Sequence, residues 1–541
     1  MDSGGVMPLS RAPLAFQAEP APLLGAQRRV ITLYTEEAAA LTDEGGWLRQ
    51  LLTGMPEMHF QVRLLARTAP GHMVAPLPAL SNQPLPHAAE AQVWSLFAPE
   101  PQHPTFSAAE KSEVEDALAS LVTGLCVPDA TAFTESLQAL SELAGSGSLT
   151  AILLSGQAAR QILWAWQQVA RPNLRPRLPV PSITDALALA EWLCGALRPL
   201  AYLPPAAELA QAQGSGAAGL AALHGLWRRG TPFILLEPQA TLRQHYLEFR
   251  RRRVPLGQKI MQLRFERLLS RAVYRQASKV VAGSARVRRW QEHLGAPPAR
   301  TLLRSGGLQL TRTAWADQPI SPEPEQAAVV WCGEWRPEEQ LETLLRAFDL
   351  VRRQRLDARL KLFGQPVAGF PAYRAWVGEL ITSLRLERCV TLEALPNDRA
   401  EVYRAGQVVV VTGSAYEVPS ALLEAMTLGR AIIAPREESS AEVVCEAGVL
   451  CAAQDLLALS SHILRLLENA PLRRTLGESA RARSVLFSSD GWLDLQRELC
   501  EQIFGSAAET DWGHKPWAET KLDLGFPHEL ELGDFDFGEN Q

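Results

Sequence analysis

The chain has 541 residues, of which 47% are hydrophobic and 21% charged, and its formal net charge is -6. Because a single hydrophobic core stops growing at roughly 250–300 residues, this length predicts two large domains, and the ordinary globular composition excludes wholesale disorder. A mildly acidic total argues against nucleic acid as the main partner, since proteins that bind it usually carry a strongly basic face.

Further features of the composition narrow the class of protein. No run approaches the roughly 20 apolar residues of a membrane-spanning helix, and the N-terminal sequence lacks the basic start and apolar block of a signal peptide. The seven cysteines are odd in number and never form a C-x-x-C pair, which disfavours a disulfide framework and a zinc site. These features predict a soluble, cytoplasmic protein without a metal site.

The first half of the chain predicts an α/β domain. Residues 1–28 are rich in Pro, Ala and Gly and are expected to form a flexible arm. The domain is predicted over 29–310, with a helix-rich insertion over about 69–200 that begins in a proline-dense loop. Its expected strands are 30–34, 60–65, 233–236, 279–282 and 301–303, and its expected helices are 47–52, 108–126, 130–143, 158–169, 219–229, 260–275 and 285–294.

A second α/β domain is predicted over 327–488, after a proline-containing connection. Its expected strands are 328–331, 360–363, 390–392, 408–411 and 431–433, and its expected helices are 341–348, 375–384, 421–428 and one capped by Asp455. A last helix within 489–505 is expected to cross back onto the first domain. It is followed by an acidic tail, 511–541, with eight acidic residues and two lysines.

Continuous apolar strands that each precede a helix are typical of parallel sheets covered on both faces. Two such units in tandem predict two Rossmann-like domains that face each other across a cleft. Ligands of these sheets bind beyond the carboxyl ends of the strands, so the loop 412–419, which leads into a helix with Glu424, is the best candidate site. Many surface helices carry glutamates at this spacing by chance, which leaves a solvated helix start as the alternative.

The segment from Glu417 to Met426 resembles the signature of retaining GT-B glycosyltransferases of family 4, in which E-G-F-P, four residues and E-A-M enclose two donor-binding glutamates. More specifically, the chain resembles the PelF-like glycosyltransferases of Pel exopolysaccharide synthesis. The segments 46–57, 230–237 and 333–348 also resemble this subfamily, and the resemblance covers residues 29–505. It implies a GT-B fold and, if the protein is active, a nucleotide-sugar donor such as a UDP-sugar, with no other cofactor.

The donor side departs from the family pattern. Aligned back from Glu424, the family's first glutamate falls on Tyr416 and its glycine on Glu417, so only the glutamate expected to hold the donor ribose is kept. The Arg and Lys that clamp the donor diphosphate fall on Glu334 and Glu339, which turns two attractions of roughly 3 kcal/mol into similar repulsions. The donor-side candidates are Glu424, Glu417, Tyr416, Ser414 and Arg336, the substituted clamps are Glu334 and Glu339, and no catalytic residue is assigned.

The acceptor side departs in the same way. The histidine that the family places near the acceptor falls on Pro238, which leaves Glu237 and Arg243 as acceptor-side candidates. Gly214-Ser215-Gly216 precedes a helix, but no strand is predicted before it, so this loop is not expected to bind a phosphate. The lone His245 is expected to be structural or solvated.

The favoured hypothesis is a catalytically impaired PelF-like protein, kept as a scaffold or regulatory partner of another glycosyltransferase or a polysaccharide-assembly subunit. Peripheral association with a membrane complex is expected, and no nucleic-acid partner. The alternative is an active retaining glycosyltransferase that uses Arg336, Arg304 or Arg436 as replacement cations. The acidic tail is interpreted either as a disordered solubilising end or as a short motif that folds onto a basic or apolar groove. Because the tail carries the whole net charge, residues 1–510 are neutral in sum.

Overall fold

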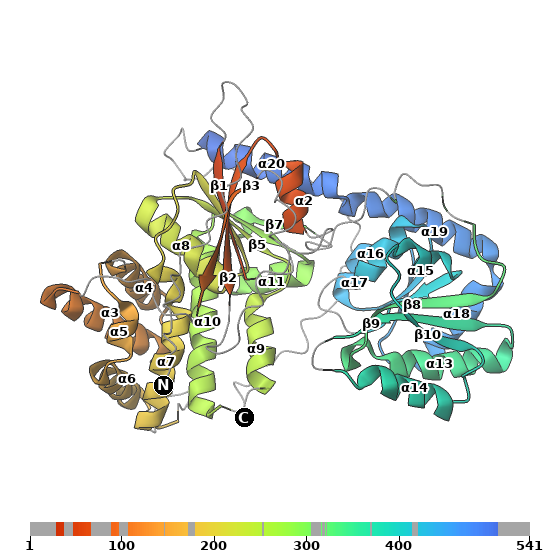
Figure 1. Ribbon diagram of the computed structural model, residues 1–541, viewed down its shortest axis with the longest axis horizontal. Helices are drawn as coiled ribbons and strands as arrows, with labels where there is room; N and C mark the ends of the chain where they lie inside the picture. Colours follow the sequence, from red (N-terminus) through yellow and green to blue (C-terminus); the bar gives the residue numbers. More distant parts are fainter. Residues whose placement is uncertain are drawn as a thin grey trace, which may run out of the picture.

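The computed structural model describes residues 29–36, 47–66, 88–96, 106–144, 146–170, 179–251, 254–304, 315, 320, 322–367, 370–413 and 420–506. They form two α/β domains, and the last helix lies against the first of them (Figure 1). None of the described helices is both long and apolar enough to cross a membrane.

Each domain is built on one parallel sheet. The strand order is β3-β2-β1-β4-β5-β6-β7 in the first domain and β10-β9-β8-β11-β12-β13 in the second. The strands of the first sheet are β1 (Val30–Thr35), β2 (His59–Ala66), β3 (Ala88–Ser95), β4 (Leu209–Gln213), β5 (Phe233–Glu237), β6 (Lys279–Ala282) and β7 (Thr301–Leu303). Those of the second are β8 (Ala328–Glu334), β9 (Arg359–Gln365), β10 (Val390–Ala394), β11 (Val408–Val410), β12 (Ala431–Pro435) and β13 (Val449–Cys451). The predicted pair of Rossmann-like domains is confirmed.

Helices connect the strands and cover both faces of each sheet. The first domain contains α2 (Trp47–Gly54), α3 (Ala108–Cys126), α4 (Ala130–Leu143), α5 (Leu149–Leu153), α6 (Gly156–Val169), α7 (Ile183–Ala196), α8 (Ala217–Arg229), α9 (Thr241–Arg251), α10 (Leu256–Gln276) and α11 (Ala285–His293). The second contains α13 (Leu341–Gln354), α14 (Tyr373–Ser383), α15 (Ala400–Arg404), α16 (Ser420–Thr427), α17 (Glu438–Val444), α18 (Leu456–Glu468) and α19 (Ala470–Ser484), and α20 (Ser489–Ser506) follows.

Several elements were not predicted from the sequence, and β3, α7 and β4 are among them. Strand β3 lies in the segment expected to begin the helical insertion, and it pairs with β2 at the edge of the first sheet, so this part of the range belongs to the sheet. Helix α7 begins with a capping box in which Ser182 and Asp185 exchange hydrogen bonds. Strand β4 has the sequence Leu-Ala-Gln-Ala-Gln, whose low β propensity hid it, yet it pairs with β1 and β5 in the middle of the sheet.

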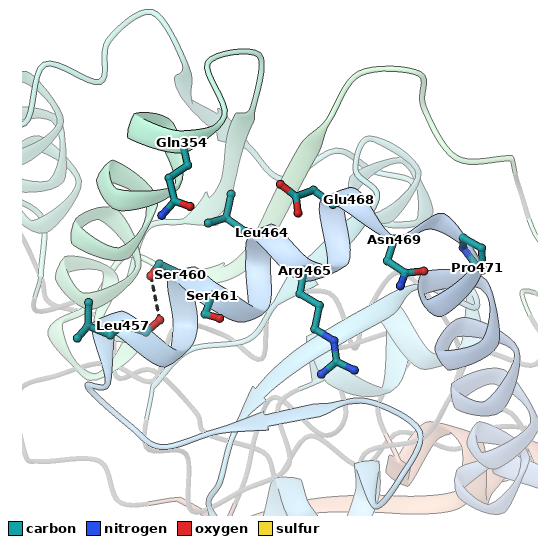
Figure 2. A pocket seen from close by; sticks show the side chains of 9 residues that line it. All are labelled: Gln354, Leu457, Ser460, Ser461, Leu464, Arg465, Glu468, Asn469 and Pro471. Atoms are coloured by element: carbon teal, nitrogen blue, oxygen red, sulfur yellow. Dashed lines mark hydrogen bonds between the residues drawn. The ribbon is translucent and has the colours of Figure 1, made fainter.

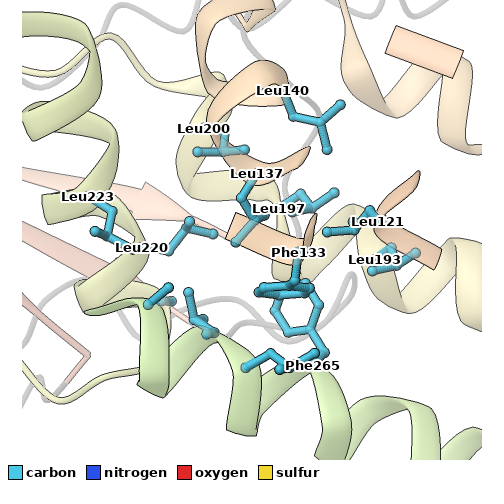
Figure 3. Packing of buried hydrophobic residues seen from close by; sticks show 14 of the residues in the cluster. Leu121, Phe133, Leu137, Leu140, Leu193, Leu197, Leu200, Leu220, Leu223 and Phe265 are labelled. Atoms are coloured by element: carbon cyan, nitrogen blue, oxygen red, sulfur yellow. The ribbon is translucent and has the colours of Figure 1, made fainter. Parts of the chain in front are cut away.

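The insertion helices share a hydrophobic core with α8 and α10 on one face of the first sheet. Figure 3 shows leucines from α3, α4, α7 and α8 around Phe133 and Phe265. The rings of Phe133 and Phe265 meet edge to face at 5.4 Å, a favoured geometry for aromatic pairs. This packing joins the insertion firmly to the sheet.

Helix α20 covers the opposite face of the first sheet. Trp492 and Ile503 are buried in one cluster with Ile31 and with residues of α2. Between these apolar contacts, Gln211 Nε2 on β4 donates a hydrogen bond to Gln496 Oε1 on α20 at 2.8 Å. The end of the chain that follows the second domain therefore completes the core of the first.

We expect Trp492→Ala to lower the free energy of unfolding by about 3–5 kcal/mol, because it removes a fully buried indole from the interface between α20 and the sheet. Leu486→Ala, at a side chain that is 39% exposed just before α20, is the matched control and should change stability by less than about 0.5 kcal/mol. Urea unfolding followed by tryptophan fluorescence and circular dichroism measures both. Equal stabilities would contradict this account of α20.

Candidate functional site

Each sheet has one place where two neighbouring strands are followed by connections that run in opposite directions. In the first sheet, the chain moves outward from β1 to β2 and β3, and from β4 to β5, β6 and β7. In the second sheet, the corresponding neighbours are β8 and β11. The carboxyl ends of such strand pairs leave a crevice where ligands of open α/β sheets bind, so these two crevices are the candidate sites.

In the second domain, the loops that follow β8 and β11 touch each other. The loop after β8 contains a short 3-10 turn over Pro337–Glu339. Gly413, which follows β11, has φ +87°, and a Cβ placed on it would lie 2.8 Å from the carbonyl oxygen of Glu338. Trp331 on β8 donates its indole N–H to the Thr412 hydroxyl at 2.8 Å. The predicted clamp positions therefore face the predicted donor loop.

The three charged residues predicted on the β8 side lie together. Arg336 Nη1 is 3.2 Å from a carboxylate oxygen of Glu334, and its Nε is 3.5 Å from one of Glu339. The cation proposed as a replacement clamp is thus shared between the two carboxylates that stand at the clamp positions.

Glu339 is the more buried of these two carboxylates, with 18% of its side chain exposed against 34% for Glu334. Burial raises the pKa of Glu339 from 4.5 to about 7; Arg336 opposes this rise and Glu334 adds to it. At neutral pH, Glu339 is therefore held near the midpoint of its titration.

Glu424 lies on α16 and is 9% exposed. Its Oε2 accepts hydrogen bonds from Tyr403 Oη at 2.6 Å and from Arg399 Nε at 3.0 Å. Tyr403 lies on α15 and Arg399 directly precedes it, and neither was predicted from the sequence as a site residue. Their spacing of four residues places both side chains on one side of a helix, but nothing in the sequence indicates that Glu424 is their partner.

The remaining donor-side candidates are placed as follows. Ser414, Tyr416 and Glu417 lie outside the described residues. Arg436 follows β12 and donates to the carbonyl oxygen of Leu450 at 3.4 Å. Arg304, the third replacement cation, lies instead at the junction of the domains, where it donates to the carbonyl oxygens of Leu486 and Ser488, and burial lowers its pKa to about 10.

A small pocket follows β11, β12 and β13 and adjoins the crevice. Thr412, Gly413, Pro435 and Gln340 are among the residues that line it, and its volume is about 30 Å³. That is the space of about one water molecule, far below the roughly 300–1,000 Å³ of sites that enclose small molecules.

A larger hollow, of about 660 Å³, lies elsewhere on the second domain. Figure 2 shows that α18 provides most of its side chains and that Gln354 comes from the end of α13. This hollow is away from the carboxyl ends of the strands, so we do not assign the donor site to it.

The crevice of the first sheet contains a glycine-rich loop. Gly214-Ser215-Gly216 directly follows β4 and precedes α8, which corrects the expectation that no strand comes before it. Gly214 has φ +90°, and a Cβ on Gly216 would lie 3.0 Å from Glu36 Oε1 and 3.3 Å from His245 Cε1. Glu36 caps α8 by accepting a hydrogen bond from Ala217 N at 2.8 Å. A carboxylate of the chain itself thus occupies the helix N-terminus that would attract a phosphate.

His245 lies beside this loop. Its Nδ1 is 3.1 Å from Glu266 Oε2 on α10, and both side chains are 9% exposed. The sequence predicted a structural or solvated histidine, and the structure shows a buried one that pairs with a carboxylate next to the glycine-rich loop. Prediction of a strand over 209–213 would have placed the glycine-rich loop between a strand and a helix, and so would have indicated this cluster.

The acceptor-side candidates occupy different environments. Glu237 is 1% exposed and accepts four hydrogen bonds from uncharged donors. Ser215 Oγ and Thr241 N donate to one oxygen at 2.9 and 3.1 Å, while Tyr274 Oη and Gln291 Nε2 donate to the other at 2.7 and 2.9 Å. The other candidate, Arg243, is partly buried on α9. Glu237 therefore ties β5 to the glycine-rich loop and to three helices.

No group of three His, Cys, Asp or Glu side chains that could hold a metal ion occurs in the part of the chain that the structure describes.

Glu339→Gln should stabilise the protein at high pH only. The folded-state pKa of about 7 lies above the ordinary 4.5, so ionising this carboxyl opposes folding; the cost is absent below pH 4.5, grows between pH 4.5 and 7, and is complete above pH 7. We expect a gain of about 3 kcal/mol at pH 8 and less than about 1 kcal/mol at pH 5, measured by urea unfolding. The exposed neighbour Glu338→Gln is the control, and a gain that is the same at both pH values would contradict the assignment.

Glu237→Gln should destabilise the first domain by about 2–4 kcal/mol, because the new amide NH₂ must face donors that the carboxylate accepted. Glu208→Gln, at an exposed carboxylate paired with Arg29 at 3.4 Å, should cost less than about 1 kcal/mol. Thermal unfolding of the two variants gives the comparison. A fully stable Glu237→Gln protein would show that the four hydrogen bonds do not matter.

Comparisons with known proteins bear on both domains. Residues 326–469 match the family model described as glycosyl transferases group 1, and residues 45–299 match a domain of unknown function, DUF3492. No curated protein matches the chain in sequence.

Solved structures with the same fold cover most of the chain. Sucrose-phosphate synthase from Thermosynechococcus elongatus is similar with a TM-score of 0.52 and 17% identity over 88% of this chain and 100% of that one. A glycosyltransferase from Rickettsia africae ESF-5 has a TM-score of 0.52 and 11% identity over 88% and 99%. Anabaena Alr3699/HepE in complex with UDP has a TM-score of 0.51 and 14% identity over 88% and 100%. These likenesses show the fold of the chain, which is GT-B, with a second domain of the glycosyl transferases group 1 type.

Proposed function

We propose that this protein is a GT-B glycosyltransferase relative impaired in sugar transfer, which acts as a scaffold or regulatory partner of another glycosyltransferase or a polysaccharide-assembly subunit. The observation that carries the proposal is the charge at the crevice between β8 and β11. Two carboxylates, Glu334 and Glu339, stand there, and one cation, Arg336, forms an ion pair with each of them. A donor diphosphate would be repelled by two anions, and it could pair with Arg336 only by displacing this side chain from its ion pairs with them.

The environment of Glu424 supports the same proposal. In the family that the sequence resembles, this glutamate holds the donor ribose. Here one of its oxygens is already used by Arg399 and Tyr403. The adjoining pocket has a volume of only about 30 Å³. Donor binding would thus have to reorganise an ion pair and open the pocket, both of which cost free energy.

The finer assignment to the PelF-like type and to exopolysaccharide synthesis depends on the sequence motifs alone, and we propose it on that ground. It suggests a protein partner from a polysaccharide-assembly complex, with peripheral attachment to the membrane through that complex.

A second candidate function is an active retaining transferase with a rearranged donor site. Two observations favour it. Because the pKa of Glu339 is about 7, part of the negative charge at the crevice is already neutralised at physiological pH. In addition, Arg336 is 42% exposed, so its guanidinium can turn toward a ligand.

Calorimetric titration of the protein with UDP-, GDP- and ADP-glucose separates the two functions. If transfer is impaired, we expect dissociation constants above about 1 mM, since the clamp contributes repulsion instead of attraction. Binding at micromolar concentration to any of the three would overturn the proposal and favour the active transferase.

Restoring the clamp tests the position of the site independently. The double change Glu334→Arg with Glu339→Lys should strengthen binding of one of these nucleotide sugars at least about tenfold, because two repulsive contacts become attractive. Glu338→Lys, which adds a cation on the same turn outside the clamp positions, is the matched control. If the double variant gains nothing over this control, the crevice between β8 and β11 is not the donor site.

A further inference from the structure

A carboxylate of the second domain bonds a helix of the first. Glu442 on α17 is 4% exposed, and its Oε1 accepts a hydrogen bond from Ala285 N at 2.8 Å. Ala285 is the first residue of α11, so its N–H has no acceptor within the helix, and the positive end of the helix dipole favours a carboxylate there. Figure 1 shows α11 and α17 facing each other between the two sheets.

Both ends of this contact are held within their own domains. Arg483 on α19 donates from Nη2 to the carbonyl oxygen of Glu442 at 2.7 Å and from Nε to that of Val443 at 2.6 Å. On the other side, the Ser284 hydroxyl caps α11 by accepting a hydrogen bond from Val287 N at 3.2 Å. The contact therefore joins two fixed helix ends, and a movement of one domain is transmitted to it directly.

Each of the two helices also adjoins one of the candidate crevices. Gln291 on α11 donates to Glu237 Oε2 at 2.9 Å, and Gly283, just before α11, donates its N–H to the carbonyl oxygen of Glu237 at 3.0 Å. Helix α17 follows β12, whose last residue, Pro435, lines the small pocket beside the donor loop. The bond between the helices thus connects the surroundings of the two crevices.

The junction between α19 and α20 is a second fixed point. Phe487 is buried in the core of the second domain and Trp492 in that of the first, so the chain passes from one core to the other over 487–492. Arg304, which follows β7, donates to the carbonyl oxygens of Leu486 at 2.6 Å and Ser488 at 3.3 Å. These bonds hold the first domain against the junction, which leaves rotation as the relative movement open to the domains at this point.

We propose that Glu442 is an interdomain latch. Its hydrogen bond to Ala285, together with the junction at 485–488, sets the angle between the two domains and so the separation of the two crevices. When the bond breaks, the domains turn about the junction as about a hinge, and the cleft between the crevices widens. This inference does not depend on whether the protein transfers sugar.

The test removes the donor and the acceptor of the bond separately. Ala285→Pro deletes the N–H, and proline is tolerated at the first position of a helix. Ser284 before it is already extended, with φ -158° and ψ 162°, as a residue that precedes proline requires. Glu442→Ala deletes the acceptor. Ala285→Ser, which keeps the N–H, and Glu446→Ala, at an exposed carboxylate just after α17, are the matched controls.

Double electron–electron resonance between spin labels on Gln244 of α9 and Glu379 of α14 measures the separation of the domains in the full chain. Labels attached to a genetically encoded keto amino acid leave the cysteines unmodified. Figure 1 shows α9 and α14 in different domains, both away from the junction between α19 and α20, so opening moves the labels apart.

We expect one narrow distance distribution for the unchanged protein and for both controls. Ala285→Pro and Glu442→Ala should each broaden it at least about twofold, toward longer distances. The double variant should be no broader than either single variant, because both remove the same bond. Hydrogen exchange at 285–288 should accelerate about tenfold in Glu442→Ala, since the start of α11 loses its cap.

The two variants act on different elements, so a folding defect in one, detected by circular dichroism, leaves the other to decide. If exchange accelerates but the distance distribution stays narrow, the bond only caps α11 and the latch is refuted. Equal broadening in Ala285→Ser or Glu446→Ala would also overturn the proposal, because opening would then not depend on this bond. Neither outcome changes the result of the nucleotide-sugar titration, which tests the proposed function by itself.

Discussion

In each domain, two neighbouring strands lie in the middle of a parallel sheet, and the strands that follow each of them along the chain are added toward opposite edges. The two candidate sites depend on this constraint. Two neighbouring strands, β1 and β4 or β8 and β11, send their following helices to opposite sides, so that the loops at their carboxyl ends diverge. Helices must cover both faces of a parallel sheet, and in the first domain α20 supplies part of that cover from the far end of the described chain. The packing of α20 therefore stabilises the sheet on which one of the crevices is built.

Three of the carboxylates that the sequence singled out lie in different environments. Glu237 accepts four hydrogen bonds from uncharged groups and joins β5 to its surroundings. Glu424 is held by a cation and a phenol, Arg399 and Tyr403. Glu339 has one long contact to Arg336 and loses solvation, which is why burial raises its pKa to about 7. The first two carboxylates stabilise the fold, whereas the third is a charge that the fold tolerates at the crevice.

The charge of the molecule is unevenly distributed along the chain. Residues 1–510 are neutral in sum, although they contain two basic stretches without acidic residues. The last 31 residues carry the net charge of -6.

The sequence by itself determined the two parallel sheets, since apolar strands followed by amphipathic helices can be buried only in that arrangement. It also located Glu334 and Glu339, which depart from the family pattern, and Glu424, which keeps it. It did not reveal β4, because Leu-Ala-Gln-Ala-Gln has little intrinsic preference for a strand; β1 and β5 provide its hydrogen bonds, and Gln211 finds its partner on α20. The glycine-rich loop after β4 was not recognised as a loop between a strand and a helix, because that strand was not predicted. Only the tertiary structure decided that Arg336 is shared between two carboxylates and that Arg399 and Tyr403 bind Glu424. These contacts join strand ends and helices, and the order of the strands in the sheet decides which of them lie close together.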